Sequence, residues 1–358
     1  MNYLGLDVHS KATVWCLLGE GGEIKERGKI ATTAVELEAL VKRLSQDEPL
    51  RVGQEVGKLS HFVHDVLSST GVELLSFNAH HLKMIASSRK KTDRRDAYWI
   101  AKVLQSGIMP HPVYITTGPV RQLRTMLSTR AALVSERTRW LVRAKTALLS
   151  AGVKAMPTQG SQRWVELALR SSDGLDEALA QRLELCQSMQ QQLSVELKRL
   201  DTSLHQVAQS TEAVRRLQTI PAVGERVALT VYAWIGDVTR FATARALCAY
   251  AGLVPSVHQS GEAQRHGGIT REGSKQLRAI LVQAGHVLLW RCQSHEAAPL
   301  KALAERVHTA RGRRKVAVVA AARFILRTAY YVLRDAANYD PTRLTRQLTE
   351  PPAQPATA

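Results

Sequence analysis

The first 80 residues alternate between short apolar runs and longer amphipathic stretches. Apolar runs separated by polar residues or by a glycine-containing turn predict strands of a hairpin meander at residues 3–6, 12–18 and 24–30. Apolar positions then recur at helical spacing up to Ser45, with Thr32 or Thr33 as the N-cap. The alternation continues as strand, helix and strand at residues 50–54, 59–69 and 72–77. This order predicts a mixed sheet with helices on its faces.

Helical spacing dominates the rest of the chain. Helices are predicted from Thr92 or Asp93 to about residue 105 and from Val120 to about residue 151. Residues 175–213 contain no Pro or Gly, and their apolar positions recur every three or four residues. That spacing indicates a coiled-coil arm or a helical hairpin segment, or equally an amphipathic helix packed on its own domain. Further helices, interrupted by a polar segment at residues 258–274, are predicted at residues 227–235, 275–289 and 316–335.

These patterns divide the chain into four parts. An α/β domain covers residues 1–155, and a helical linker or coiled-coil arm covers residues 156–213. A mainly helical domain covers residues 214–345, and a Pro- and Ala-rich tail covers residues 346–358. The tail is expected to be disordered.

Composition narrows the class of protein. The chain has 358 residues, of which 45% are hydrophobic, and this share argues against wholesale disorder. The longest apolar run, Val316 to Ala322, is far shorter than the ~20 residues of a membrane helix. No signal peptide is apparent. The four cysteines are scattered without a CxxC pair, which argues against a disulfide framework or a cysteine zinc site and suits a reducing cytosol.

Positive charge is the strongest compositional bias. The 49 Lys and Arg outnumber the 31 Asp and Glu by 18. Such an excess favours a polyanionic partner, usually nucleic acid, over the alternative of a basic surface without a ligand. The excess is concentrated in three segments, and its nucleic-acid-binding candidates are Lys90, Lys91, Arg94, Arg95, Arg124, Arg139, Arg143, Arg313, Arg314 and Lys315.

Four acidic residues stand out by position. Asp7 ends the first predicted strand and Glu55 ends the fourth, so they lie close together if those strands are neighbours. Asp93 and Asp96 are three residues apart, which places both on one face of a helix. Converging carboxylates suit Mg²⁺, and two such ions could activate an oxygen nucleophile and stabilise the leaving oxygen of a phosphodiester. The alternative for each residue taken singly is a solvated surface acid.

A turn at residues 220–224 lies between two predicted helices and has the pattern apolar-Pro-x-apolar-Gly. It resembles a helix-hairpin-helix, in which backbone N–H groups at a helix start bind a DNA phosphate. Ala222 stands where that motif often has glycine. A helix cap with nothing bound is the alternative.

These motifs together resemble the DEDD-type insertion-sequence transposases of the IS-one-ten / IS-eleven-eleven family, which are bridge-RNA-guided recombinases. The resemblance covers about residues 3–335 in the same motif order. It is carried by residues 5–11, 54–57, 78–81, 91–97, 220–224, 251–256, 260–261 and 267–278.

The resemblance implies a RuvC-like (RNase H-like) α/β N-terminal domain, a helical linker and a mainly α C-terminal transposase domain. It implies a metal-binding tetrad for Mg²⁺, with Mn²⁺ as a substitute in vitro, made of Asp7, Glu55, Asp93 and Asp96. It also implies a serine nucleophile in the C-terminal domain, and Ser260 matches that position, with Ser256 and Ser274 as rivals. The chain departs from the family at Glu262, which replaces a glycine, and lacks the aromatic residue often found after Glu55.

The leading hypothesis is a DNA recombinase that excises and inserts its mobile element through a serine–DNA intermediate, guided by an element-encoded RNA. Its expected partners are element and target DNA, the bridge RNA and further copies of the chain in a homodimer or homotetramer, in the bacterial cytosol or nucleoid and not at a membrane. One alternative is a metal-dependent nuclease of the Holliday-junction type, in which water attacks and Ser260 is dispensable. Another is a non-catalytic nucleic-acid-binding protein.

Overall fold

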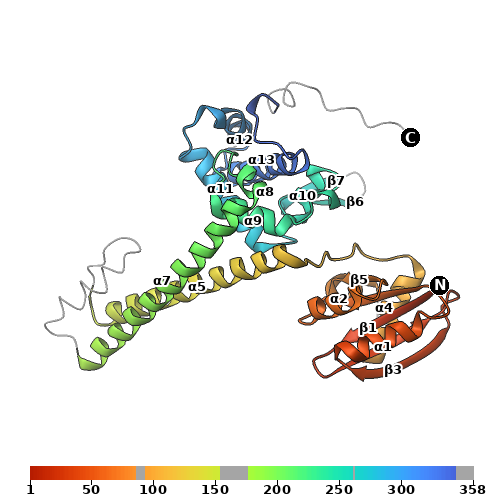
Figure 1. Ribbon diagram of the computed structural model, residues 1–358. Coiled ribbons are helices and arrows are strands. Elements are labelled where there is room, and N and C mark those ends of the chain that lie inside the picture. The colour runs from red at the N-terminus through yellow and green to blue at the C-terminus, as the bar shows by residue number, and fades with distance from the viewer. Residues whose placement is uncertain (86–92, 154–175, 261–262, 344–358) are drawn as a thin grey trace. The chain divides into compact units, whose positions relative to one another are not determined.

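The computed structural model describes residues 1–85, 93–153, 176–260 and 263–343. The chain divides into two compact units, Met1–Gly118 and Pro119–Ala358 (Figure 1). This division precedes the long helix α5 (Gly118–Ser150), because Leu123 and Leu127 of that helix are buried in the core of the second unit. The domain boundaries drawn from the sequence, including the one at residue 155, stay predictions.

The first unit is built on a five-stranded mixed sheet with the strand order β3-β2-β1-β4-β5. Strands β1, β2 and β3 form an antiparallel meander, whereas β4 and β5 run parallel to β1. The strands are β1 (Asn2–Val8), β2 (Ala12–Leu18), β3 (Ile24–Ala31), β4 (Leu50–Glu55) and β5 (Glu73–Phe77). The mixed sheet expected from the sequence is confirmed, with β1 and β4 as neighbours.

Helices cover both faces of this sheet. They are α1 (Ala34–Leu44), α2 (Ser60–Ser68), α3 (Ala79–Ile85) and α4 (Asp93–Ser106). Thr33 is the N-cap of α1, where its side chain accepts a hydrogen bond from the Glu36 amide. Successive residues of a strand point to opposite faces. Leu4 and Leu6 of β1 therefore join the core with α1 and α2, whereas the intervening Gly5 faces α4.

Gly5 allows α4 to lie directly on the sheet, because a Cβ at this position would be 2.0 Å from the Ala97 carbonyl oxygen and 2.6 Å from the Ala101 amide nitrogen. We expect Gly5→Ala to push the backbones of β1 and α4 apart. This should lower the free energy of unfolding by at least about 1–3 kcal/mol, the usual cost of overpacking. Urea unfolding measures this change. Gly57→Ala is the matched control, since nothing lies within 4 Å of a Cβ there. Equal stability of the two variants would contradict this packing.

The second unit begins with two long helices that pack side by side, α5 and α7 (Glu177–Ser210) (Figure 1). Ala144 and Leu148 near the end of α5 contact Leu183 and Cys186 near the start of α7. The pair is therefore antiparallel, and a bidentate pair between Arg130 and Asp201 joins its middle. The leucine spacing seen in the sequence belongs to a helix with a partner in the same chain; a coiled-coil arm stays a prediction.

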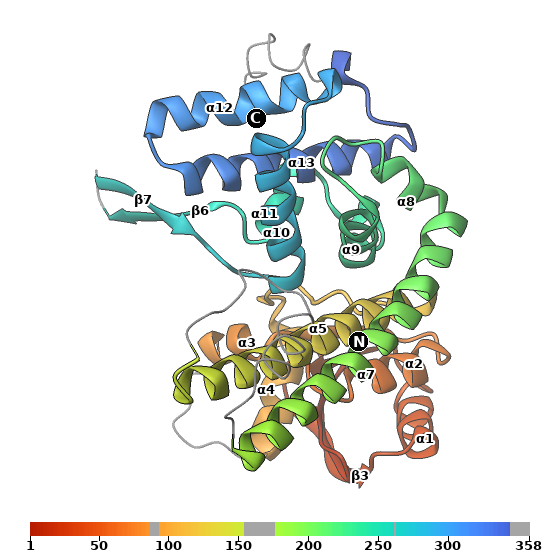
Figure 2. The same ribbon diagram turned by 90° about the vertical axis from the view of Figure 1, so that its left-hand side faces the viewer.

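The remaining helices surround one large apolar core. They are α8 (Glu212–Leu217), α9 (Glu225–Ile235), α10 (Ala244–Tyr250), α11 (Lys275–Trp290), α12 (Ala298–Arg311) and α13 (Arg314–Arg334), with short 3₁₀ turns at Val238–Arg240 and His295–Ala297. The polar segment before α11 contains an antiparallel hairpin of β6 (Pro255–Ser260) and β7 (Ala263–Ile269), which projects from the helices (Figure 2). The turn between α8 and α9 places Ala222 at a positive φ of 65°, the conformation that glycine adopts most readily.

The apolar run at residues 316–322 lies in α13, which has 21 residues. By length and composition alone, α13 is the one helix in the described part of the chain that could cross a membrane. Ala321, Ile325 and Ala329 are among its many side chains buried in the core against neighbouring helices. This burial is typical of the core helix of a globular unit.

Candidate active site

The carboxyl ends of β1 and β4 bring two of the predicted acids to one edge of the sheet. The strands are parallel, and Leu6 is paired with Gln54. Asp7 and Glu55 are the next residues on these two strands. The register therefore sets their backbones side by side, as the sequence predicted for neighbouring strands.

Helix α4 brings the other two acids to the same edge. Asp93 and Asp96 occupy its first turn, and Ala97 follows where the helix packs on Gly5 of β1. The close packing at Gly5 fixes the start of α4 near Asp7, two residues along the strand. Side-chain ligand atoms of Asp7, His9 and Asp93 lie within 4.8 Å of one another. Glu55 and Asp96 are not part of this three-residue group.

His9 is a member of the group that the sequence interpretation did not single out. Its Nε2 atom lies 3.2 Å from Asp7 Oδ2 and 3.5 Å from Asp93 Oδ2. The available signal was its position two residues after Asp7, just beyond the end of β1, where the alternation of the strand would put it on the same side as Asp7. The group therefore offers two carboxylates and one imidazole nitrogen.

Asp7 is the member of the cluster whose ionised form is destabilised by its surroundings. Its side chain is 15% exposed, compared with 62% for Asp93. Burial raises the pKa of Asp7, His9 lowers it, and the charges of Asp96 and Asp93 raise it further. Keeping Asp7 ionised therefore costs free energy, which a cation would recover. Carboxylate oxygens suit Mg²⁺ and Mn²⁺, so the two carboxylates of the group fit a divalent ion of this kind.

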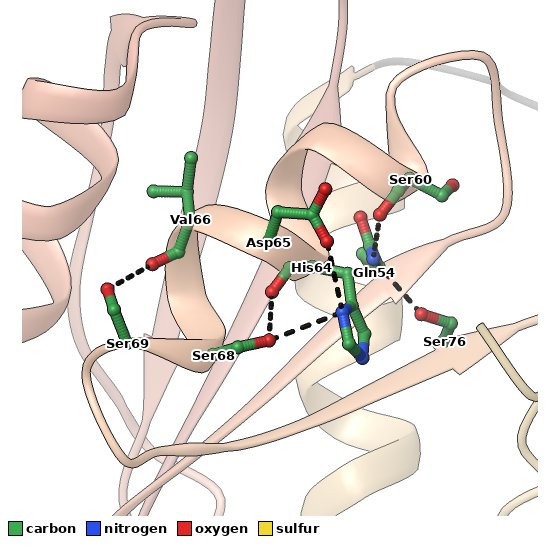
Figure 3. Close-up of polar contacts among 8 residues, drawn as sticks. All are labelled: Gln54, Ser60, His64, Asp65, Val66, Ser68, Ser69 and Ser76. Atoms are coloured by element: carbon green, nitrogen blue, oxygen red, sulfur yellow. Dashed lines mark hydrogen bonds and ion pairs between the residues drawn. The ribbon is translucent and has the colours of Figure 1, made fainter. Parts of the chain in front are cut away.

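Buried polar contacts hold the end of β4 in place beneath Glu55. Gln54 donates from Nε2 to Ser76 Oγ on β5 at 3.0 Å and to the Ser60 carbonyl oxygen at 3.3 Å (Figure 3). Ser60 Oγ accepts a hydrogen bond from the Gly57 amide at 2.7 Å. These bonds fix the chain on both sides of Glu55, which leaves its exposed side chain at the edge of the sheet.

Divalent ions are expected to stabilise the protein through Asp7. Without metal, Asp7→Asn should raise the melting temperature, because it removes a buried charge that the native state holds at a cost. Addition of Mg²⁺ or Mn²⁺ should raise the melting temperature of the unmodified protein by several degrees and leave Asp7→Asn unchanged. The metal effect should shrink as pH falls through the raised pKa of Asp7, since a proton then competes with the ion.

Differential scanning fluorimetry measures these shifts. Asp47→Asn is the matched control, because Asp47 is an exposed acid of the same unit and lies outside the cluster. An equal metal response in Asp7→Asn and the unmodified protein would contradict the site.

Comparison with known proteins covers both units. A DEDD transposase model of the IS110 type matches residues 4–152, and a model described as "Transposase IS116/IS110/IS902 family" matches residues 214–301. The chain belongs to the IS110/IS116 family of transposases. The first match contains the whole acidic cluster, and the second contains Ser260. This transposase therefore acts on DNA.

Curated relatives extend over most of the transposase. It is 28% identical over 294 residues to the transposase for insertion sequence element IS1111A of Coxiella burnetii, covering 80% of this chain and 77% of the relative. It is 26% identical over 255 residues to the transposase for insertion sequence element IS1328 of Yersinia enterocolitica, covering 71% and 75%. A shorter match, 29% over 125 residues, is to the pilin gene-inverting protein of Moraxella lacunata, covering 35% and 38%.

Most basic residues proposed to bind nucleic acid lie on the surface of the transposase. Arg94 and Arg95 are exposed beside the acids of α4, whereas Lys90 and Lys91 lie outside the described residues. On α5, the guanidinium of Arg143 lies 4.4 Å from the Trp140 ring centroid, and Arg139 pairs with Glu136. The exposed cations at the start of α13 are Arg313, Arg314 and Lys315.

Arg124 has different surroundings. Its guanidinium donates to the carbonyl oxygens of Ala233 at 2.7 Å and Trp234 at 2.9 Å, near the end of α9. Arg240 donates to the carbonyl oxygens of Trp234 and Ile235 at the same helix end. Cations at a helix C-terminus satisfy free carbonyls and the helix dipole. Arg124 thus holds α5 against α9, and this contact accounts for its charge without a nucleic acid.

The three candidate serines of the transposase lie around the β6–β7 hairpin. Ser260 is the last residue of β6, paired with Ala263, and its side chain lies outside the described part of the structure. Ser256 donates to the Gly268 carbonyl oxygen at 3.1 Å. Ser274 is the N-cap of α11 and accepts from the Leu277 amide at 3.2 Å. Both rival serines therefore have structural hydrogen bonds.

Proposed function

We propose that this transposase cleaves and rejoins DNA strands to excise and insert its mobile element, with a Mg²⁺-dependent DEDD site, Ser260 as nucleophile and an element-encoded guide RNA. The observation that carries the proposal is the convergence of Asp7, His9 and Asp93 within 4.8 Å. They meet at the edge of a mixed sheet in a chain of this family.

The residues that would hold the metal are Asp7, Glu55, Asp93 and Asp96, with His9 beside the first and third. A bound Mg²⁺ ion supplies Lewis-acid chemistry, which promotes attack by an oxygen nucleophile and stabilises the leaving oxygen of a phosphodiester. The protein's own contribution is to hold the acids in register, through β1, β4 and α4. Arg94 and Arg95 are exposed on the same helix as two of the acids, and this supports a role for them in binding DNA phosphates.

The proposed covalent step conserves the phosphodiester. Ser260 Oγ forms a bond to phosphorus, the bond to one strand oxygen breaks, and the serine proton ends on that leaving oxygen. A hydroxyl of the partner strand later attacks the same phosphorus, and the proton it loses ends on the released serine. One phosphodiester replaces another in each half, so no external energy source is needed. Ser256 and Ser274 already have structural hydrogen bonds, and this supports Ser260 over these two rivals.

The distribution of positive charge supports the proposed partners. Basic residues stand in both units, on α4, on α5 and at the start of α13. Several basic surfaces suit a folded guide RNA together with element and target DNA, whose sequences base pairing would select. Strand exchange needs several active sites, which supports a homodimer or homotetramer. DNA as substrate supports a location in the bacterial cytosol or nucleoid.

The experiment that tests the function is recombination of two DNA duplexes, one with element ends and one with a target, in the presence of the transcribed flanking RNA and Mg²⁺. The expected product joins element to target. Nicked DNA with free ends and no joined product would instead support the water-dependent nuclease, because the metal cluster alone suffices for hydrolysis. Binding without cleavage would support the non-catalytic alternative.

A further inference from the structure

A half-exposed tryptophan ends helix α11. The Trp290 side chain is 51% exposed and is the last residue of the helix. His286, one turn earlier, is also exposed, and the two ring centroids lie 5.0 Å apart with their planes at 37°. Neither ring belongs to the apolar core of the second unit. Two aromatic rings are therefore presented together at the surface.

Close helix packing holds these rings beside the start of α13. A Cβ on Gly285 of α11 would lie 2.7 Å from the Val318 carbonyl oxygen and 3.2 Å from the Ala322 amide nitrogen. The helix backbones thus touch next to His286. One turn beyond this contact, His286, Trp290, Arg314 and Lys315 line a single open pocket. The close crossing of α11 and α13, and not a loop, therefore positions the two rings of α11 opposite the two cations of α13.

The cations at this pocket are not stabilised by the dipole of their own helix. Arg313, Arg314 and Lys315 stand at the N-terminus of α13, where the helix dipole disfavours positive charge. Among the described residues, none of the three forms an ion pair with a carboxylate, and no acid lines the pocket. Their charges add to the positive end of the dipole and raise the local potential. An anionic ligand is the partner that such an arrangement favours.

We propose that this pocket binds one unpaired nucleotide of a single-stranded nucleic acid, with its base stacked on Trp290 and its flanking phosphates bound by Arg314 and Lys315. An exposed indole bordered by cations matches the two chemical parts of a nucleotide, its flat base and its anionic backbone. Bases within a duplex are already stacked and do not offer this face. The inference rests on the proposed function for its nucleic-acid partner but not on the acidic cluster or Ser260.

Equilibrium binding to short labelled strands tests the site. Trp290→Ala should weaken binding of the full chain to unstructured oligothymidylate or oligouridylate about 5- to 100-fold, the usual loss of one stacked base. Trp290→Phe should restore most of the affinity, whereas Trp290→Leu, which keeps an apolar side chain without a π face, should not. A strand of the same length with abasic sugars isolates the phosphate contacts. It should bind the unmodified protein and Trp290→Ala equally.

The outcomes separate this site from its alternatives. A larger effect with oligouridylate assigns the pocket to RNA, and one with oligothymidylate assigns it to DNA. Leu149→Ala is the matched control, because Leu149 is 54% exposed on α5 and far from the pocket in sequence. Unchanged binding by Trp290→Ala, or an equal loss with abasic strands, would overturn the proposal. A change in oligomeric state without a change in affinity would identify a protein interface instead. These measurements need no strand cleavage. Their outcome is therefore independent of whether the recombination reaction succeeds.

Discussion

Asp7→Asn is expected to lower the rate of Mg²⁺-dependent DNA strand cleavage by more than about 100-fold. Loss of an outer partner of a metal ligand typically costs 10- to 100-fold, and loss of a ligand itself should cost more. Asparagine keeps the size of the side chain while removing the charge that faces His9 and Asp93. The measurement is the single-turnover rate on DNA with an element end.

Two further measurements show whether a loss of cleavage by Asp7→Asn is specific to catalysis. DNA binding by Asp7→Asn should be retained or should tighten slightly, because a negative charge near the substrate is lost. Asp47→Asn, an exposed acid outside the cluster, should cleave at the normal rate. Normal cleavage by Asp7→Asn, or an equal loss in Asp47→Asn, would show that the acidic cluster is not the catalytic site.

Ser260→Ala is expected to abolish covalent protein–DNA adducts and recombination. Removal of the nucleophile of a serine enzyme lowers turnover by about 10⁶-fold, so no joined product should be detectable. The metal site in the first unit remains complete in this variant, and its divalent-ion stabilisation should be normal. Denaturing gels detect the adduct as labelled DNA that migrates with the protein.

The rival serines supply matched controls. Ser274→Ala should lower the free energy of unfolding by about 1 kcal/mol, because α11 loses its N-cap, but it should still form adducts. Ser256→Ala should also recombine, with the hairpin bond to Gly268 lost. Adducts that persist in Ser260→Ala and vanish in either control would move the nucleophile to that control position.

The geometry of the acidic edge followed from the sequence where local patterns determined it. Alternating apolar runs ended at Asp7 and Glu55, and the parallel pairing of β1 with β4 sets these residues side by side. The spacing of Asp93 and Asp96 placed both in one helical turn. That turn can pack on the sheet because Gly5 has no side chain to hold α4 away. This contact joins residues far apart in the sequence, so no local pattern predicts it.

Other features depended on tertiary contacts that a pattern does not contain. His9 gains its place in the cluster only because Asp93 arrives from a distant helix. Arg124 looked like a surface cation in a basic helix, but the carbonyl oxygens at the end of α9 accept its hydrogen bonds. The β6–β7 hairpin arises in a polar segment without the alternation of a half-buried strand. For His9 and Arg124 the deciding partner lies far away in sequence.

The most direct test of the account is to identify the amino acid that becomes joined to DNA. Adducts formed on an element end with Mg²⁺ would be digested with trypsin, and the nucleotide-bearing peptide fragmented by mass spectrometry to separate Ser256 from Ser260. The account predicts a single adduct at Ser260, formed only with a divalent ion and only when Asp7 is intact. Cleaved DNA with no protein attached, or an adduct on another residue, would contradict it.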